Sequence, residues 1–291
     1  MYIRKILWFC MALSASTYTL ASDIADAAKR GDTDLVRNLI KQKVDVNEPQ
    51  VDGSTALLWI VRINDTDTAK LLLDAGANPS TGNRTEAFPL EQAAINGSAE
   101  MLNLLLEAGA DPNVPVTHSR DTALMLAART GLADAVKVLI DHGANVNAEE
   151  PWGRTTSLMW AVAENNAEVV SMLIQAGANI NSSTVFVPPD TGRGFEGSSP
   201  RERLPDEVGP VQFASGELTP LMFAAREGHI ESAKLLIAAK ADLNAIASDG
   251  KDALSLAIFN GNYEFANLLI DSGADLNQSD ANGYTPLFWA V

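Results

Sequence analysis

The sequence contains few of the side chains that build catalytic and metal sites. It has one cysteine, Cys10, and three histidines, His118, His142 and His229, which lie far apart along the chain. No group of His, Cys and Asp has the spacing of metal ligands, and no nucleophile elbow, phosphate-binding glycine loop or dinucleotide fingerprint is present. We therefore expect a protein that is not an enzyme, with no catalytic residue, no metal and no cofactor.

Basic residues are also scarce. The chain has 21 Lys and Arg against 37 Asp and Glu, a net charge of −16, and only 6% of its residues are aromatic. A surface this acidic repels phosphate backbones and anionic lipids, so we expect no nucleic-acid partner. With 46% hydrophobic and 20% charged residues, the composition is typical of a folded chain rather than a disordered one.

One apolar run stands at the N-terminus, and no other stretch is apolar enough to cross a membrane. Arg4 and Lys5 precede this run at residues 6–15, and residues 19–21 read Thr-Leu-Ala, with the small residues that signal peptidase prefers. We interpret residues 1–21 as a Sec-type signal peptide cleaved after Ala21, and we expect the protein in the periplasm or outside the cell. A retained anchor helix is the alternative. The run is shorter than the ~20 apolar residues of a membrane span, so we expect no membrane insertion of the mature chain.

One pattern recurs along the chain every 33 or 34 residues. It consists of a Thr-like residue, an apolar stretch with a small pair, a Gly or Asn, a second apolar stretch with helical spacing, and Gly-Ala-Asp/Asn-x-Asn. The Thr-like positions are Ser22, Thr55, Phe88, Thr122, Thr156, Thr219, Asp252 and Thr285. Only the interval between Thr156 and Thr219 breaks the period, with about 30 extra residues.

This pattern resembles the ankyrin repeat, whose period is 33 residues. The matching text includes Thr-Pro-Leu-Met-Phe-Ala-Ala at residues 219–225 and Gly-Ala-Asp-Pro-Asn at residues 109–113. In style the chain is similar to secreted and periplasmic bacterial members of the family. The resemblance implies an all-α solenoid of helix–turn–helix units with short β-hairpin-like fingers. We expect repeats at about 22–51, 52–83, 84–116, 117–150, 151–182, 216–247 and 248–280, a partial repeat at 281–291, and a loop insertion at 183–215.

The local chemistry agrees with this resemblance. A Thr or Ser side chain at the start of a first helix can accept an unpaired backbone N–H, and Pro220 and Pro286 fall in the first turn, where a missing N–H costs little. Glycines follow the second helices, where a left-handed residue is favoured. One unit cannot bury its own apolar face, so neighbouring units must stack to form a continuous core.

Two positions of the repeat depart from the family pattern. The histidine that usually follows the Thr-Pro-Leu leucine is absent, and the position holds Leu58, Glu91, Met125, Met159, Met222, Ser255 and Phe288. We expect apolar packing to replace its hydrogen bonds. The next position holds the large residues Trp59, Leu126, Trp160, Phe223 and Trp289. We interpret these as core residues, and a row of ligand-stacking aromatics is the alternative.

The resemblance implies binding through the fingertips and the exposed ends of the first helices, which line a concave groove. Those helix-end positions follow the small pair, and the first of them is basic in four of seven repeats. The candidate partner-binding residues are Lys29, Arg30, Arg62, Ile63, Ile95, Asn96, Arg129, Thr130, Glu164, Arg226, Glu227, Phe259 and Asn260. We hypothesise that Lys29, Arg62, Arg129 and Arg226 recognise carboxylates of an acidic partner. The alternative is that nearby Asp and Glu balance each cation, which then contributes little.

The insertion at residues 183–215 is the second candidate site. It is rich in Pro and Gly and shows no helical or strand period. We expect it to project from the fingertip edge, where insertions in repeat proteins often bind partners. Its candidate residues are Phe186, Arg193, Phe195 and Phe213. A spacer without a binding role is the alternative.

The C-terminus falls inside an expected first helix, because the chain stops at Val291, six residues after Thr285. We therefore expect the sequence to be a fragment. Taken together, the residues predict a monomeric protein-interaction module or scaffold that binds a protein partner of unknown identity. The alternative is a docking or regulatory domain of a larger secreted enzyme whose catalytic part lies beyond residue 291.

Overall fold

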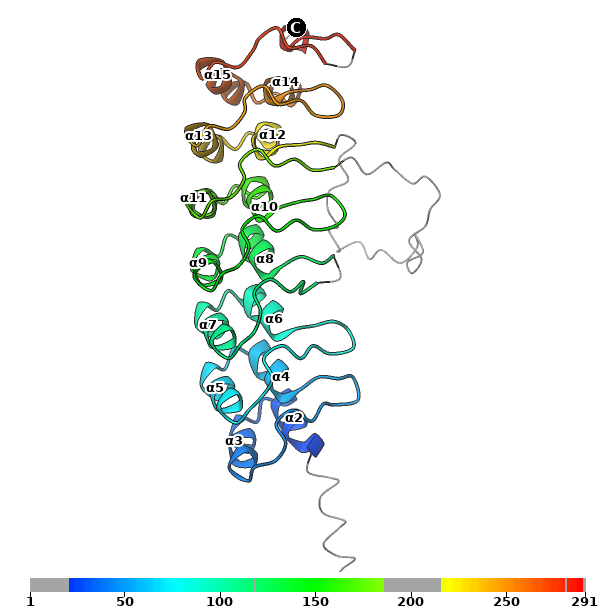
Figure 1. Cartoon of the computed structure of the whole chain (residues 1–291), viewed down its shortest axis with the longest axis vertical. Helices are drawn as coiled ribbons and strands as arrows, with labels where there is room; N and C mark the ends of the chain where they lie inside the picture. The colour runs from blue at the N-terminus through cyan, green and yellow to red at the C-terminus, as the bar shows by residue number, and fades with distance from the viewer. Residues whose placement is uncertain (1–20, 118, 186–215, 281, 290–291) are drawn as a thin grey trace, which may run out of the picture. The chain divides into compact units, whose positions relative to one another are not determined.

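The computed structural model describes residues 21–291 except residues 118, 186–215, 281 and 290–291 (Figure 1). The predicted signal peptide thus lies outside the described residues up to its last position, Ala21, where the first described helix begins. The chain divides into two compact units, which we describe separately. The N-terminal unit comprises residues 1–127 and 134–145, and the C-terminal unit comprises residues 128–133 and 146–291.

The described residues form pairs of short helices, as the repeat pattern predicts. The N-terminal unit contains α2 (Ala21–Lys29), α3 (Thr33–Lys41), α4 (Ala56–Arg62), α5 (Thr66–Asp74), α6 (Pro89–Asn96) and α7 (Ala99–Glu107). Helices α8 (Ala123–Thr130) and α9 (Ala133–Asp141) contribute residues to both units. The C-terminal unit contains α10 (Ser157–Ala163), α11 (Ala167–Gln175), α12 (Pro220–Glu227), α13 (Ile230–Ala238), α14 (Ala253–Phe259), α15 (Tyr263–Asp271) and α16 (Pro286–Trp289).

The fingers between helix pairs are irregular hairpins. Within the described part of the chain no strand forms, and one isolated antiparallel bridge joins Glu149 and Thr156. The all-α fold class is therefore confirmed, and the β-hairpin-like character of the fingers is limited to their backbone turns.

The helices pack in two rows within each unit (Figure 1). In the N-terminal unit the first helices α2, α4 and α6 pack in sequence, and the second helices α3, α5 and α7 form a row beside them. In the C-terminal unit α10, α12, α14 and α16 pack in sequence, and α11 packs on α13. Inner first helices such as α4 and α12 are thus enclosed by their neighbours, as stacked repeats require.

Small residues allow the first helices to approach one another. The pair Ala93 and Ala94 in α6 and the pair Ala224 and Ala225 in α12 are all 0% exposed. Larger apolar side chains fill the space between the two rows, including Leu72 in α5 and Leu105 in α7, both also 0% exposed. The core of each unit therefore lies between its two rows of helices.

Hydroxyl side chains begin most first helices, as the sequence predicts. The Thr55, Thr156 and Thr219 hydroxyls each accept the N–H of the third residue onward at 3.3–3.4 Å. Phe88 cannot do so, and here the Glu91 carboxylate accepts the Phe88 N–H at 3.2 Å instead. Each arrangement satisfies a donor that the start of a helix leaves unpaired.

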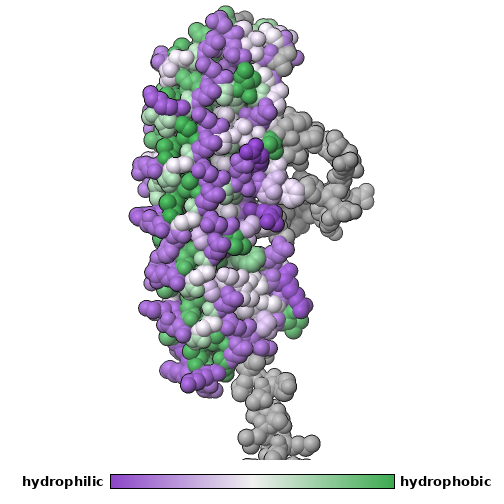
Figure 2. All heavy atoms as spheres, viewed as in Figure 1, coloured by the Kyte–Doolittle hydropathy of each residue, from purple (hydrophilic) through white to green (hydrophobic). Residues whose placement is uncertain are grey.

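The second helices carry an acidic residue in the first turn. These residues are Asp34, Asp67, Glu100, Asp134, Glu168, Glu231 and Glu264. A carboxylate there interacts favourably with the positive end of the helix dipole. Figure 2 shows hydrophilic side chains projecting over these helices on the face that it draws. These seven acidic residues therefore stabilise the starts of the second helices.

Asparagines connect neighbouring fingers within each unit. Asn47 Nδ2 donates to the Gly76 carbonyl at 2.9 Å, and Asn47 Oδ1 accepts the Asn78 N–H at 2.8 Å. The same acceptor bond recurs at 2.7–2.9 Å from Asn113, Asn147, Asn181 and Asn244 to the next finger. The final Asn of the repeat motif is thus a polar tie between adjacent repeats.

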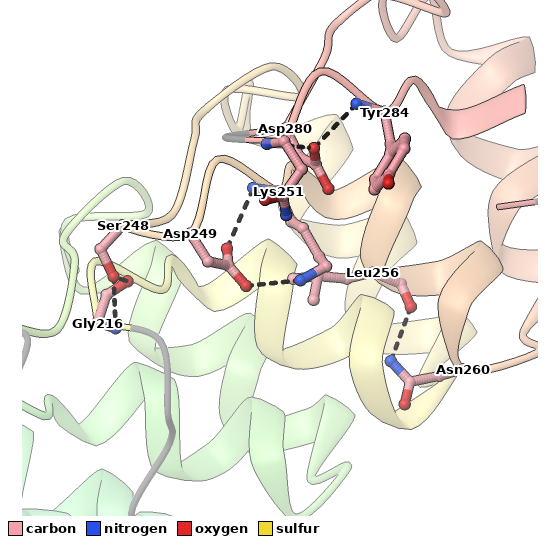
Figure 3. A network of polar contacts seen from close by, with 9 residues as sticks. Gly216, Ser248, Asp249, Lys251, Leu256, Asn260, Asp280 and Tyr284 are labelled. Carbon is pink, nitrogen blue, oxygen red and sulfur yellow. Dashed lines mark hydrogen bonds and ion pairs between the residues drawn. The ribbon is translucent and has the colours of Figure 1, made fainter. Parts of the chain in front are cut away.

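The fingers of the C-terminal unit are further held by side chains that bind backbone groups (Figure 3). Asp249 accepts the Lys251 N–H at 3.1 Å and forms an ion pair with the Lys251 ammonium at 2.8 Å. Asp280 accepts the N–H groups of Asn282 and Tyr284 at 2.8 and 3.0 Å. Such short-range bonds favour turns over regular strands.

Asp252 departs from the hydroxyl residues that begin the other first helices of the C-terminal unit. Its side chain is 0% exposed, and its Oδ1 accepts the Ser255 N–H at 2.7 Å. Among the described residues its Oδ2 has no hydrogen-bond partner. Burial raises the pKa of the Asp252 carboxyl above its usual value, and the nearby Asp275 raises that pKa further. Keeping this carboxylate ionised therefore lowers the free energy of unfolding of the protein.

We predict that Asp252→Thr increases the stability of the protein at pH 7. A threonine hydroxyl can accept the Ser255 N–H, as the other threonine caps do, and it removes a buried oxygen without a partner, which is worth about 1 kcal/mol. A carboxyl whose pKa is raised by folding destabilises the fold fully above the raised pKa and not at all below its unfolded pKa. The gain, measured as a shift of the urea unfolding midpoint, should therefore shrink as the pH falls through the raised pKa and disappear below the usual pKa of an aspartate.

Thr219→Asp is the matched control, because it places a carboxylate at the same position of a neighbouring repeat. This variant should lose stability at pH 7 and recover it in acid. An Asp252→Thr gain of equal size at acidic and neutral pH would show that the charge of Asp252 is not the cause.

Candidate functional site

The candidate partner-binding residues lie at the ends of the first helices, as the sequence predicts. In the N-terminal unit Lys29, Arg62 and Ile95 occupy or adjoin the last positions of α2, α4 and α6, which pack in sequence. Arg30, Ile63 and Asn96 are the positions that follow them. In the C-terminal unit the corresponding residues are Arg129, Thr130, Glu164, Arg226, Glu227, Phe259 and Asn260.

Two cations lie over one indole ring in the N-terminal unit. Lys29 Nζ is 5.1 Å and Arg62 Cζ 5.5 Å from the centroid of the Trp59 ring. Trp59 Nε1 donates to Gln50 Oε1 at 2.9 Å, and the Gln50 amide in turn donates to the Asp26 carboxylate. These bonds fix the orientation of the indole. Each cation–ring contact stabilises the arrangement by about 0.5–1 kcal/mol at an exposed site.

Apolar side chains are exposed beside these cations. Ile63 is 49% and Ile95 54% exposed, and Lys29 and Arg62 are exposed as well. We call Lys29, Trp59, Arg62, Ile63 and Ile95 the N-terminal patch. Within the described ranges no carboxylate forms an ion pair with either Lys29 or Arg62. The patch therefore offers positive charge and apolar area together.

Asn96 has a structural contact instead of a free side chain. Its Nδ2 donates to the Val61 carbonyl at 3.0 Å and approaches that of Arg62 at 3.5 Å. Asn262 makes the same kind of contact in the C-terminal unit, to Ala225 and Arg226 at 3.0 and 2.9 Å. These amides satisfy the carbonyls that helix ends leave unpaired.

The cations of the C-terminal unit also lie over aromatic rings. Arg129 Cζ is 5.2 Å from the Trp160 ring centroid, and Arg226 Cζ is 5.4 Å from that of Phe223. Arg226 differs because its Nε also pairs with Glu227 Oε1 at 2.7 Å. Arg226 is therefore balanced by the carboxylate of the next residue. Arg129, at the same position of another repeat, has no ion pair among the described residues.

The remaining candidates of the C-terminal unit are partly engaged. Lys251 Nζ lies 5.6 Å from the ring centroid of Phe259, which is 58% exposed. Asn260 Nδ2 donates to the Leu256 carbonyl of its own helix at 2.8 Å. Phe259 therefore presents an apolar surface with a cation beside it, whereas the Asn260 amide serves the end of α14.

The large residues of the repeat differ in burial. Leu126 and Phe223 are 6% and 3% exposed and belong to the core. Trp59 and Trp160 are half-buried, and each carries a cation on its ring. Sequence reasoning missed this pairing, although the spacing of three between Trp59 and Arg62, and between Phe223 and Arg226, places each pair on one helix face.

The insertion begins and ends in a closed finger. Ordinary fingers are closed by a backbone bond between residues four or five apart, such as Gln50 N–H to Ser54 O at 2.9 Å. In the finger that carries the insertion, Thr184 N–H donates to Leu218 O at 3.1 Å and Glu217 N–H donates to Thr184 O at 2.9 Å. The residues on either side of the insertion therefore close a single finger.

Neighbouring fingers hold both sides of this closure. Val185 N–H donates to the Gly153 carbonyl at 3.0 Å. On the other side Gly216 N–H donates to Ser248 Oγ at 2.9 Å (Figure 3). The candidate residues Phe186, Arg193, Phe195 and Phe213 lie outside the described residues.

The described residues contain no group of three or more His, Cys, Asp and Glu that could hold a metal ion. Of the described helices, none has both the length and the apolar character to cross a bilayer.

A family model described as ankyrin repeats, in three copies, matches residues 24–116, 113–184 and 221–291. Two solved structures are similar in fold. The ankyrin repeat domain of Bcl-3 matches with a TM-score of 0.67 at 24% identity, covering 82% of this chain and 95% of that domain. The human ASB11 ankyrin repeat domain matches with a TM-score of 0.65 at 24% identity, covering 87% and 98%. At this identity the similarity establishes the fold and not the partner.

Animal proteins contain similar repeats as a small part of their length. Human ankyrin repeat and SOCS box protein 16 is 35% identical over 105 residues, which are 36% of this chain and 23% of that protein. Human transient receptor potential cation channel subfamily A member 1 is 34% identical over 68 residues, 23% of this chain and 6% of the channel. Drosophila melanogaster palmitoyltransferase Hip14 is 34% identical over 93 residues, 32% of this chain and 15% of that enzyme. This chain therefore matches only a fraction of each relative.

We predict that Trp59→Phe destabilises the protein more than Trp160→Phe does. Both changes leave a similar cavity and keep a ring beneath the arginine. Only Trp59 loses a hydrogen bond, to Gln50, whereas no described residue accepts from the buried Trp160 Nε1. The difference in unfolding free energy should be about 1 kcal/mol, measured by urea denaturation. Equal losses would mean that the Gln50 bond contributes nothing.

Proposed function

The chain belongs to the ankyrin-repeat family, and on that premise we propose that it is a protein-interaction module without catalysis of its own. The observation that carries the proposal is the N-terminal patch, where exposed Ile63 and Ile95 lie beside the exposed cations Lys29 and Arg62. Interfaces between proteins combine apolar area with arginine and aromatic side chains in this way.

The patch is formed before any partner arrives. Its residues stand on α2, α4 and α6, which are held by the core and by the Asn96 bond to α4. The indole at its centre is fixed through Gln50. A surface that is already ordered loses little conformational entropy on binding, and this favours affinity.

We also propose that the protein is exported. The support is the N-terminal segment, in which Arg4 and Lys5 precede an apolar run and Ala21 ends a sequence suited to signal peptidase. The relatives described above are animal proteins, so the expected resemblance to secreted bacterial members rests on this segment alone.

A second candidate function is a docking domain of a larger enzyme. The match to the Drosophila palmitoyltransferase favours it, because that enzyme contains similar repeats over 15% of its length. Under this second function the repeats of this chain bind a partner or substrate, and a part of the protein beyond residue 291 carries out the catalysis.

Site-specific photo-crosslinking in the native host tests the interaction surface. We expect a photoreactive amino acid at Ile95 to form a discrete adduct with a partner protein, because Ile95 is exposed within the patch. Leu71 is the matched control. It is 41% exposed but stands on the second helix α5 of the same unit, and it should give no such adduct. Adducts of equal yield from both positions, or from neither, would refute the proposed surface.

Mass spectrometry of the protein recovered from its producing cells tests export. We expect a mature chain that begins at Ser22 in the extracellular or periplasmic fraction. Charged substitutions in the apolar run, Leu7→Arg with Phe9→Arg, should keep the protein inside the cell, since a signal peptide needs an apolar centre. A protein that still begins at Met1 after release, or that is released despite these substitutions, would contradict the assignment.

A further inference from the structure

We propose that Lys29, Trp59 and Arg62 form a receptor for an acidic residue of the partner, and that the partner segment places an apolar residue beside this acid. The inference rests on the proposed function, because it names the chemistry of the segment that the N-terminal patch binds. It assigns to one cluster of side chains a role that composition alone disfavours in a chain of net charge −16.

The two cations place positive charge around one ring. Both lie over the same ring, at 5.1 and 5.5 Å from its centroid. An anion that approaches this ring is attracted by both cations. The face of the indole restrains both side chains, so a carboxylate meets charges that are already positioned.

The nearby carboxylates leave Arg62 as the less balanced cation. Asp52 accepts the Ser54 N–H, which is the main reason that its pKa lies below its usual value, and the charge of Lys29 contributes to the same shift. The Asp26 carboxylate accepts from the Gln50 amide. No described carboxylate pairs with Arg62, and its planar guanidinium can bind a carboxylate through two parallel bonds.

The apolar residues of the patch explain why the partner segment should carry an apolar residue beside its acid. Ile63 directly follows Arg62, and Ile95 ends α6 one residue before Asn96, whose amide lies against the carbonyls of Val61 and Arg62. Two exposed isoleucines thus lie at the same helix ends as Arg62. A free anion would leave them in water, whereas a peptide with an apolar side chain next to its acid would bury both.

Arg62 can be compared with Arg226, which stands at the same position of another repeat. Arg226 occupies the position of Arg62 and lies over Phe223 as Arg62 lies over Trp59. Its guanidinium is already paired with Glu227 at 2.7 Å, and its side chain is only 22% exposed. The stacked arginine recurs, but the chain itself provides the carboxylate at Arg226 and leaves that place open at Arg62.

Nucleic acid is the other class of ligand that combines stacking with charge. An indole flanked by cations can bind a base and its phosphate. The acidity of the whole chain opposes this, because a nucleic acid would bring many negative charges to a surface of the same sign. The observations therefore favour a short acidic and apolar peptide.

The test uses synthetic ten-residue peptides titrated into the purified full-length protein. One peptide alternates Glu and Leu, the second alternates Gln and Leu, and a ten-nucleotide single-stranded DNA is the third ligand. Binding is followed by NMR through the indole N–H signal of Trp59, assigned with Trp59→Phe. We expect the Glu peptide to shift this signal, with an affinity at least about tenfold above that of the Gln peptide or the DNA. The affinity should fall as salt is added.

Matched variants locate the acid. Arg62→Glu should weaken binding of the Glu peptide about tenfold or more, and Arg62→Lys should weaken it less, because the charge stays and the planar fork is lost. Arg226→Glu should change the affinity less than about twofold, since its arginine is already paired. Circular dichroism melting curves establish that the three variants remain folded. An unfolded Arg62→Glu variant is replaced by Arg62→Gln, which carries the same expectation.

Several results would overturn the inference. These are no Trp59 shift with the Glu peptide at millimolar concentration, equal binding of the Gln peptide, tighter binding of the DNA, or equal losses from Arg62→Glu and Arg226→Glu. A failure of this inference can be distinguished from a failure of the proposed function. An Ile95 adduct that survives Arg62→Glu would leave the interaction surface in place and remove only its acidic specificity.

Discussion

Close packing of the first helices is the constraint on which the rest of each unit depends. In α4 the consecutive residues Ile60 and Val61 are both 0% exposed, so the residues on either side of them carry the side chains that can reach solvent. Trp59 and Arg62 are three apart and share one face of the helix. The contact between a half-buried ring and an exposed cation is therefore a consequence of where a tightly packed helix can place large side chains.

Asparagine takes over the polar connection between repeats that histidine provides in the family pattern. We expected apolar packing at the histidine position, and Met222 is 1% exposed there, while its sulfur also accepts the Thr219 N–H at 3.4 Å. The hydrogen bonds between repeats lie elsewhere, at the finger amide of Asn47 and the helix-end amides of Asn96 and Asn262. Each amide satisfies backbone groups of its neighbour, so the stack is tied by polar bonds as well as by its core.

Features that depend on local chemistry could be predicted from the sequence. The helix pairs, the threonine caps and the glycines after the second helices, such as Gly76 with φ 93°, follow from residue type and period. The place of Lys29 over Trp59 could not be predicted, because it joins residues 30 apart through flexible side chains. The hydrogen bond of Asn96, which the sequence places among the partner-binding candidates, could not be predicted either. The position of Asn96 on the helix was readable, but the direction of its amide toward the Val61 carbonyl was not.

The interrupted finger shows why the repeat can accept about 30 extra residues. Asn181 Oδ1 accepts the Asp242 N–H at 2.9 Å, which is the bond that Asn47 makes to the next finger in an uninterrupted repeat. The packing of α10 on α12 likewise joins the repeats on either side of the insertion. Because Thr184 and Leu218 close the turn, the ends of the insertion stay as near as those of a short loop. The entropy of closing a loop rises only slowly with its length. The length of this finger can therefore vary without changing the register of the stack.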